Sequence, residues 1–275
     1  MNQEALGKDL IQNPRLWRLG LRIDSSALHV VLFCTVEDNS LIHRKIMLDK
    51  AAPSLLKALE DAIYENPLLL SDFDKVDCVV ETGRFAVVPA SVTSADVREK
   101  IMAKMFDGFD GEIVANGLPG QNATILMGLD GDFAGFLRRT FNNPMIHHHL
   151  APLCRYFHNK SRLGNSGKMY AYIHGDRVDV MAFGRDTLML ANTFRFRAPM
   201  DAVYYILSCR KMLDLDAAAD EMLLAGDNEV REAITPVLRE YLAYVMPVIF
   251  PSSMFKAGKD SMNAPFDLIV LPLCE

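Results

Sequence analysis

Residues 170–196, YAYIHGDRVDVMAFGRDTLMLANTFRF, decide the fold of this chain, because a similar pattern occurs earlier at residues 21–47, LRIDSSALHVVLFCTVEDNSLIHRKIM. Each stretch reads as short strands separated by turns, which is typical of an antiparallel meander. With Ile23 aligned on Ile173, apolar residues of the second strand coincide at one offset: Leu28 with Val178, Val30 with Val180, and Phe33 with Phe183. Each copy continues into a third strand, at 40–48 and 187–196. The repeat predicts two related sheet domains, one carrying each copy.

Helix-like and strand-like stretches alternate after each meander. Apolar residues spaced three and four apart predict helices at 51–66, 94–105, 133–141, 150–158, 200–213 and 229–244. Short apolar runs predict strands at 76–80, 85–88, 112–116, 123–128, 145–149, 221–225, 245–250 and 266–271. This alternation predicts mixed sheets with helices packed on their faces. The linker-like segment SRLGNSGK at 161–168 predicts an N-terminal domain of residues 1–162 and a C-terminal domain of residues 163–275.

The composition is that of a folded globular chain. Half of the 275 residues are hydrophobic and 23% are charged. The net charge of −6 comes without a long basic run, which argues against nucleic-acid binding and against binding to an anionic membrane. The N-terminal residues lack the pattern of a signal peptide, and the longest apolar run near the end, 241–254, is too short to span a bilayer. The five widely spaced cysteines never form C-x-x-C, so we expect a reduced, cytoplasmic protein.

The order of elements carries a resemblance to a known superfamily. A meander followed by alternating helices and strands, present twice, resembles the actin, sugar-kinase and heat-shock-protein-70 ATPases. The segments DKVDCVVETGRFAVVPASV (74–92) and YAYIHGDRVDVMAF (170–183) more closely resemble a bacterial family of unknown function, domain of unknown function 3822. Both halves are also similar to pilus-assembly actin-like proteins. The resemblance covers nearly the whole chain. It implies an α/β fold of two related RNase H-like domains, each a mixed sheet with a three-strand antiparallel meander and flanking helices.

The resemblance also implies a nucleotide cleft between the domains. In the superfamily, an acidic residue in a hairpin orients hydrated Mg²⁺, and small residues let backbone N–H groups approach phosphate oxygens. The first hairpin here keeps Asp24 at the acidic position, with the small residues Ser25 and Ser26 in place of the usual glycine. The second hairpin keeps Gly175, followed by Asp176.

Other features of that cleft are incomplete. His174 stands where the second hairpin would carry an acid, and only Gly226 remains of a glycine pair that would lie against adenosine. We therefore interpret Asp24, Ser25, Ser26, Gly175, Asp176 and Gly226 as a vestigial nucleotide cleft. We expect no cofactor, with Mg²⁺–ATP as the alternative, and no ATP hydrolysis. In the simpler interpretation, Asp24 and Asp176 only hydrogen-bond their own tight turns.

Other residues of the sequence suggest two further kinds of site, a zinc site and a nuclease site. His147, His148 and His149, with Cys154 and His158 downstream, suggest zinc, but three consecutive residues project in different directions from any regular element. We therefore expect surface or interdomain histidines and no metal. A nuclease of related sheet order would use carboxylates such as Asp24 and Glu81, but two-metal chemistry needs more carboxylates and a basic substrate track.

These observations favour a non-catalytic scaffold or assembly protein that acts through protein–protein contacts, with a protein partner or as a homodimer. The alternative is an ATP-binding switch or an ATP-dependent enzyme that uses the cleft. We expect neither a nucleic-acid partner nor membrane insertion.

Overall fold

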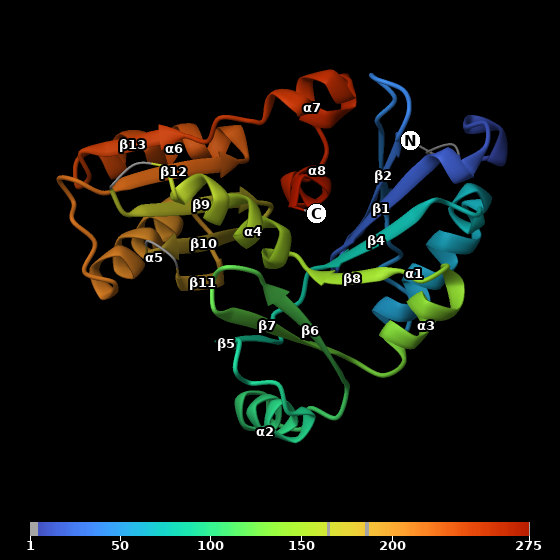
Figure 1. Cartoon of the computed structure of the whole chain (residues 1–275), viewed down its shortest axis with the longest axis horizontal. Helices are drawn as coiled ribbons and strands as arrows, with labels where there is room; N and C mark the ends of the chain where they lie inside the picture. The colour runs from blue at the N-terminus through green and yellow to red at the C-terminus, as the bar shows by residue number, and fades with distance from the viewer. Residues whose placement is uncertain (1–4, 164–165, 185–186, 275) are drawn as a thin grey trace.

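Two five-stranded sheets of identical topology form the framework of the molecule (Figure 1). The computed structural model describes residues 5–163, 166–184 and 187–274. The first sheet has the order β3-β2-β1-β4-β8 and consists of β1 (Trp17–Ile23), β2 (Ala27–Cys34), β3 (Ile42–Met47), β4 (Lys75–Val80) and β8 (Met145–His148). The second has the order β11-β10-β9-β12-β13 and consists of β9 (Lys168–His174), β10 (Arg177–Phe183), β11 (Leu188–Arg195), β12 (Glu221–Gly226) and β13 (Tyr244–Pro247).

Strand pairing confirms the sequence repeat. In each sheet the first three strands form an antiparallel meander, and the last two join in parallel beside its first strand. Ile23 pairs with Leu28 in the first meander, and Ile173 pairs with Val178 in the second. Two related domains with mixed sheets are therefore present.

The central strands of each sheet are buried on both faces. Alternate strand residues pack outward against helices: α1 (Leu55–Tyr64) and α3 (Phe133–Thr140) on the first sheet, and α5 (Pro199–Met212) and α6 (Asn228–Arg239) on the second. Ile23, Val30, Ile173 and Val180 lie on these outer-facing sides and are 0–1% exposed, as the alternation predicts. The opposite faces pack inward, toward the other domain.

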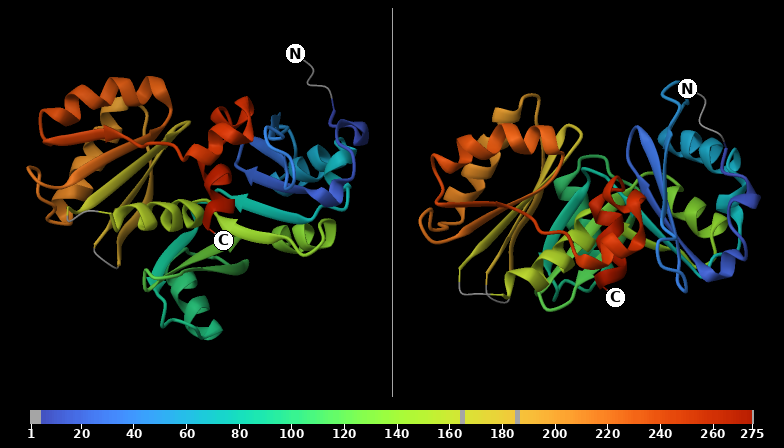
Figure 2. Two further views of the ribbon diagram at one scale, coloured as in Figure 1. Left: turned by 45° about the horizontal axis from the view of Figure 1, so that its top comes forward. Right: turned by 90° about the horizontal axis from the view of Figure 1, so that it is seen from above.

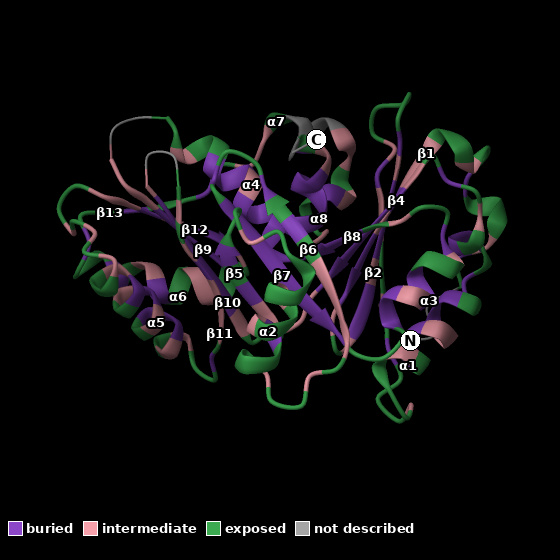
Figure 3. Cartoon of the chain, turned by 60° about the horizontal axis from the view of Figure 1, so that its bottom comes forward, coloured by how far each residue is buried: buried purple, intermediate pink, exposed green. Residues whose placement is uncertain are grey.

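The layer between the domains contains two helices. Helix α4 (Leu150–Ser161) connects the domains, and the short α8 (Phe266–Val270) packs against it and against β1 (Figures 1 and 2). One apolar cluster joins residues of both sheets to residues of α4 and α8. Figure 3 shows buried residues along both sheets and in this layer.

Residues 85–129 form a separate unit on the first domain. Strands β5 (Phe85–Pro89), β6 (Glu112–Leu118) and β7 (Ala123–Leu129) form an antiparallel sheet of order β5-β7-β6, and α2 (Ala95–Met105) packs on it. The sequence predicted these strands but not that they leave the main sheet.

The strand predicted at 266–271 is wrong. These residues form α8 and the start of a 3₁₀ helix (Leu271–Cys274). All five residues of α8 are buried, so their pattern is continuously apolar apart from Asp267 and cannot be told from a buried strand by periodicity. Before α8, the C-terminal segment contains α7 (Ser252–Ala257) and a 3₁₀ helix (Lys259–Met262).

The C-terminal segment contacts the first domain as well as the second. Leu41 donates a backbone hydrogen bond to Ala257, and the backbone N–H of His43 donates to Asp260. The division at residues 162 and 163 stays a prediction. Within the described part of the chain, no helix combines the length and apolar character needed to cross a bilayer.

Candidate functional site

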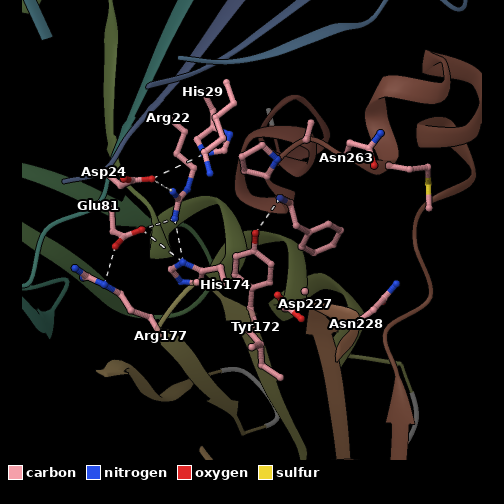
Figure 4. Close-up of a pocket in the computed structure, with 18 of the residues that line it drawn as sticks. Arg22, Asp24, His29, Glu81, Tyr172, His174, Arg177, Asp227, Asn228 and Asn263 are labelled. Atoms are coloured by element: carbon pink, nitrogen blue, oxygen red, sulfur yellow. Dashed lines mark hydrogen bonds and ion pairs between the residues drawn. The ribbon is translucent and has the colours of Figure 1, made fainter. Parts of the chain in front are cut away.

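A cleft of about 810 Å³ opens between the two domains. Its walls come from the β1–β2 turn, the β9–β10 turn, the start of α6 and the C-terminal segment (Figure 4). Six residues assigned from the sequence to a vestigial nucleotide cleft all line this cavity: Asp24, Ser25, Ser26, Gly175, Asp176 and Gly226. Whether they bind a nucleotide stays a prediction, but the structure brings them together.

Arg22 lies at the floor of the cleft. Its side chain is 5% exposed and lies between three carboxylates. Its Nη1 is 3.0 Å from Asp24 Oδ2, its Nε is 2.8 Å from Asp267 Oδ2, and its Nη2 pairs with Glu81. Burial alone would lower the pKa of Arg22, but Asp267 and Glu81 outweigh it and raise the pKa.

Sheet topology explains this convergence. Arg22 and Asp24 lie at the end of β1, and Glu81 directly follows the parallel neighbour β4, where its N–H donates to Ile23 at 2.9 Å. Asp267 comes from α8, which packs against β1. Sequence reasoning missed Arg22 and Asp267. Arg22 could have been found as a charged residue between the apolar residues Leu21 and Ile23 of a strand, because a buried charge needs ionic partners.

Asp24 also holds its own turn together. Its Oδ1 accepts hydrogen bonds from the Ser26 N–H at 2.7 Å, the Ser26 hydroxyl at 2.7 Å and the Ala27 N–H at 2.9 Å. Burial acts to raise the pKa of Asp24, but these bonds and Arg22 lower it overall. Asp24 therefore makes the turn hydrogen bonds of the simpler interpretation, but it does not make these alone, because its Oδ2 also pairs with Arg22. Asp176 instead is exposed and pairs with Arg195 at 3.2 Å.

His174 joins the two domains. Its Nδ1 lies 3.2 Å from Arg22 Nη2 and 3.5 Å from Glu81 Oε2, and its Nε2 lies 2.9 Å from Asp179 Oδ2 (Figure 4). Arg177 adds a second link, with its Nε 2.8 Å from Glu81 Oε1. Burial opposes protonation of His174, but Asp179 outweighs it and raises the pKa of the ring. Strands β9 and β10 are thereby tied to β1 and β4 through side chains.

Gly226 has a structural reason to be glycine. Its φ is +92°, and a Cβ there would lie 1.9 Å from the carbonyl oxygen of Ile173. The residue lets the end of β12 approach the end of β9 closely. The next residue, Asp227, caps α6 by accepting a hydrogen bond from the Val230 N–H at 3.2 Å.

The expectation of surface histidines is wrong for the triplet. His147, His148 and His149 are 5%, 0% and 0% exposed, because β8 and the start of α4 lie inside the molecule. The three rings point to different partners, at Asp77 Oδ1 (3.2 Å), the Thr82 carbonyl (3.1 Å) and Asp179 Oδ1 (3.3 Å). Only the last of these contacts crosses between domains, so the interdomain alternative holds for His149.

The carboxylates of the nuclease hypothesis also meet. Asp24 and Glu81 both contact the Arg22 guanidinium. A cation already lies between them, whereas two-metal chemistry would need metal ions at that position. At the rim of the cleft, His29 lies 3.2 Å from His43, and burial together with Arg22 and His43 lowers the pKa of His29 to about 4.

Comparison with known proteins agrees with the fold. A family described as "Protein of unknown function (DUF3822)" matches residues 10–245. A crystal structure from Bacteroides thetaiotaomicron, of a protein with actin-like ATPase fold and unknown function, superposes with a TM-score of 0.80 and 25% identity over 95% of this chain and 97% of that one. A PilM–PilN type IV pilus biogenesis complex gives 0.53 and 16% identity over 95% and 98%. No curated protein matches the sequence.

Proposed function

This chain belongs to the DUF3822 family of proteins of unknown function, and from the geometry of its cleft we propose that it is a non-catalytic scaffold or assembly protein. It would act in the cytoplasm through protein–protein contacts, with a protein partner or as a homodimer. The observation that carries this proposal is the Arg22 guanidinium at the centre of the cleft carboxylates.

The position of Arg22 works against Mg²⁺-dependent hydrolysis. Hydrated Mg²⁺ needs oxygen ligands with free lone pairs and an octahedral arrangement of water. Asp24 and Glu81, the acids best placed to orient it, already balance Arg22, and Asp267 completes that pairing. A metal ion would have to enter beside a fixed positive charge and compete for the same oxygens. That competition disfavours the binding of Mg²⁺ in the position that phosphoryl transfer requires.

The hairpins support the same proposal. Asp24 Oδ1 is already used by its own turn, and His174 is used to connect Arg22 with Asp179. The first hairpin is therefore stabilised by its own hydrogen bonds, and the second supports the contact between domains. Losing one hydrogen-bond donor in a preorganised anion site can cost about 3 kcal/mol of transition-state stabilisation, so several such changes together should leave turnover near background.

A protein partner is the kind of ligand we favour. PilM, which has the same fold, occurs in a solved structure as a PilM–PilN complex in type IV pilus biogenesis. By analogy, the present chain would offer its surface to another protein while the cleft residues hold its two domains in a fixed arrangement. The cytoplasmic location is supported by the four described cysteines, which are free and buried.

A nucleotide-binding switch is a second candidate, and the cleft volume favours it. A cavity of about 810 Å³ is in the range of small-molecule sites. Asn228, Arg231 and Lys45 line it and could contact an anionic ligand. Such a ligand could bind weakly and stabilise the observed arrangement of the two domains without being hydrolysed.

A phosphate-release assay tests the scaffold proposal. Full-length protein should release phosphate from Mg²⁺–ATP at the background rate, and Asp24→Ala should do the same. Turnover well above background that disappears in Asp24→Ala would mean that the cleft is catalytic and the scaffold proposal is wrong. Thermal denaturation with ATP, with and without Mg²⁺, separates the switch: a raised midpoint without turnover would favour nucleotide binding.

A further inference from the structure

His149, His174 and Asp179 bring three metal-ligating side chains to one point between the domains. His149 precedes α4, His174 ends β9, and Asp179 lies in β10. The Nε2 of His149 is 3.3 Å from Asp179 Oδ1, and the Nε2 of His174 is 2.9 Å from Asp179 Oδ2. One potential ligand atom from each of the three residues lies within 4.8 Å of the other two. We propose that this cluster binds one divalent transition-metal ion, such as Zn²⁺, which joins the two domains.

The spacing suits a single ion. Zinc bonds to imidazole nitrogen and carboxylate oxygen are about 2.0–2.2 Å long, so ligand atoms around one tetrahedral ion lie roughly 3–3.5 Å apart. The two histidine–aspartate separations, which go to different oxygens of Asp179, are close to that range, and all three ligand atoms lie within 4.8 Å of one another. Small side-chain shifts would therefore be enough to place an ion between the rings and the carboxylate.

The surroundings resemble an outer shell of a metal site. The Thr193 hydroxyl donates to Asp179 Oδ1 at 2.7 Å, which orients the carboxylate. The far nitrogen of His174 lies 3.2 Å from Arg22 Nη2 and 3.5 Å from Glu81 Oε2, so a guanidinium and a carboxylate both neighbour it. Both polar contacts of the His149 ring, to Asp179 and Thr193, are made by its Nε2, whereas its buried Nδ1 has no hydrogen-bond partner among the described residues.

The network around the cluster contains more carboxylates than guanidinium groups. Four carboxylates, those of Asp24, Glu81, Asp179 and Asp267, share this network with two guanidinium groups, those of Arg22 and Arg177. None of these side chains is more than 16% exposed. Carboxylates therefore outnumber guanidinium groups in this buried network, and buried negative charge is costly unless it is compensated. A divalent ion at the proposed site would offset this excess, as protonation of a histidine in the cluster also would.

The donor set also selects the class of metal. Two imidazoles and one carboxylate suit zinc and neighbouring transition metals, whereas Mg²⁺ prefers oxygen ligands and water. His174 lines the cleft and is 14% exposed, so an ion could reach the site from there. This inference departs from the sequence-based expectation of no metal, which considered the histidine triplet and did not include His174 or Asp179.

Zinc titration of the full-length protein, purified without an affinity tag and stripped with a chelator, tests the proposal. Calorimetry should give one Zn²⁺ per chain, and Zn²⁺ should raise the thermal midpoint while Mg²⁺ should not. His174→Gln and Asp179→Asn should each weaken zinc binding by more than about 100-fold. His147→Gln is the matched control, because His147 is also buried in the same triplet but contacts Asp77, and this variant should bind zinc like the wild type.

Either of two results would overturn the proposal. One is a wild-type protein that binds no stoichiometric zinc, a result that does not depend on how any variant folds. The other is wild-type affinity in His174→Gln, which would place the ion elsewhere, for example at the His29–His43 pair. Circular dichroism checks that each variant is folded. None of these readouts involves ATP, so the scaffold proposal stands or fails separately.

Discussion

Arg22 lies on β1 between Leu21 and Ile23, two residues that pack on the outer side of the sheet. Strand alternation therefore directs its side chain to the inner side, into the layer between the domains. There its charge would be very costly without partners, and Asp267 and Glu81 are at least as buried as Arg22 itself. The ion cluster is one interdependent unit: each member is tolerated because the others are present.

Replacing Arg22 tests this dependence. Arg22→Met should lower the free energy of unfolding by about 3–5 kcal/mol, because it leaves buried carboxylates without their counter-charge. Urea denaturation followed by circular dichroism gives the value. Arg15→Met is the control, since Arg15 pairs with Asp72 at the surface, where both side chains are more than half exposed, and it should change stability little. Equal effects of the two substitutions would contradict the structural role of Arg22.

The two domains use equivalent elements in different ways. Both β1–β2 and β9–β10 are hairpins at the mouth of the cleft, but the first is held by Asp24 and the second turns at Gly175 with φ +53°. Strand β12 ends at Gly226, which lies directly against Ile173 of the neighbouring strand β9. Two glycines at the cleft are therefore constrained differently. A Cβ at Gly175 would meet open space, whereas a Cβ at Gly226 would clash with the backbone of β9.

A pair of alanine substitutions distinguishes these constraints. Gly175→Ala should cost about 1–2 kcal/mol of unfolding free energy, the penalty for a left-handed conformation in a residue with a Cβ. Gly226→Ala should cost more, at least about 2 kcal/mol, because the same kind of strain is combined with a clash against the backbone of β9. Chemical denaturation of both variants measures the order. A smaller cost at Gly226 would mean that β9 and β12 can separate easily.

At the scale of the whole molecule, one apolar layer connects the domains. Helices α4 and α8 fill it, and the C-terminal segment contributes Phe266, Leu268, Val270 and Leu271 as buried residues. The Phe266 N–H also donates to the Tyr172 hydroxyl at 3.1 Å, and burial raises the pKa of that hydroxyl. The C-terminal segment therefore packs between the two sheets and contacts both of them.

Removing the C-terminal segment should disrupt the arrangement of the domains. A chain that ends at Phe250 loses several buried apolar side chains, each worth about 1.5–3 kcal/mol, together with the Asp267 partner of Arg22. We expect a much lower thermal midpoint and increased binding of a hydrophobic dye. Asp267→Asn in the full chain separates the ionic part from the apolar part and should have the smaller effect. A truncated chain that unfolds at the wild-type midpoint would show that the C-terminal segment does not hold the domains together.

Local patterns predicted most of the architecture. The meanders repeat because side chains alternate between the two faces of a strand, and the aligned residues Ile23 and Ile173 are both buried at equivalent pairing positions. The strand predicted at 266–271 failed because α8 is enclosed on every side, which removes the periodicity that marks a helix. The separate sheet of residues 85–129 was missed because pairing partners leave no local signal.

The sequence by itself determined the duplicated fold and named six residues that line one cleft, because turn chemistry and strand alternation are properties of neighbouring residues. Only the tertiary structure decided what surrounds those residues. Arg22 and Asp267 are 245 positions apart, and His149, His174 and Asp179 come from three elements in two domains. Their chemistry depends on burial and on distances between charges, and both arise only when the sheets and the C-terminal segment pack together.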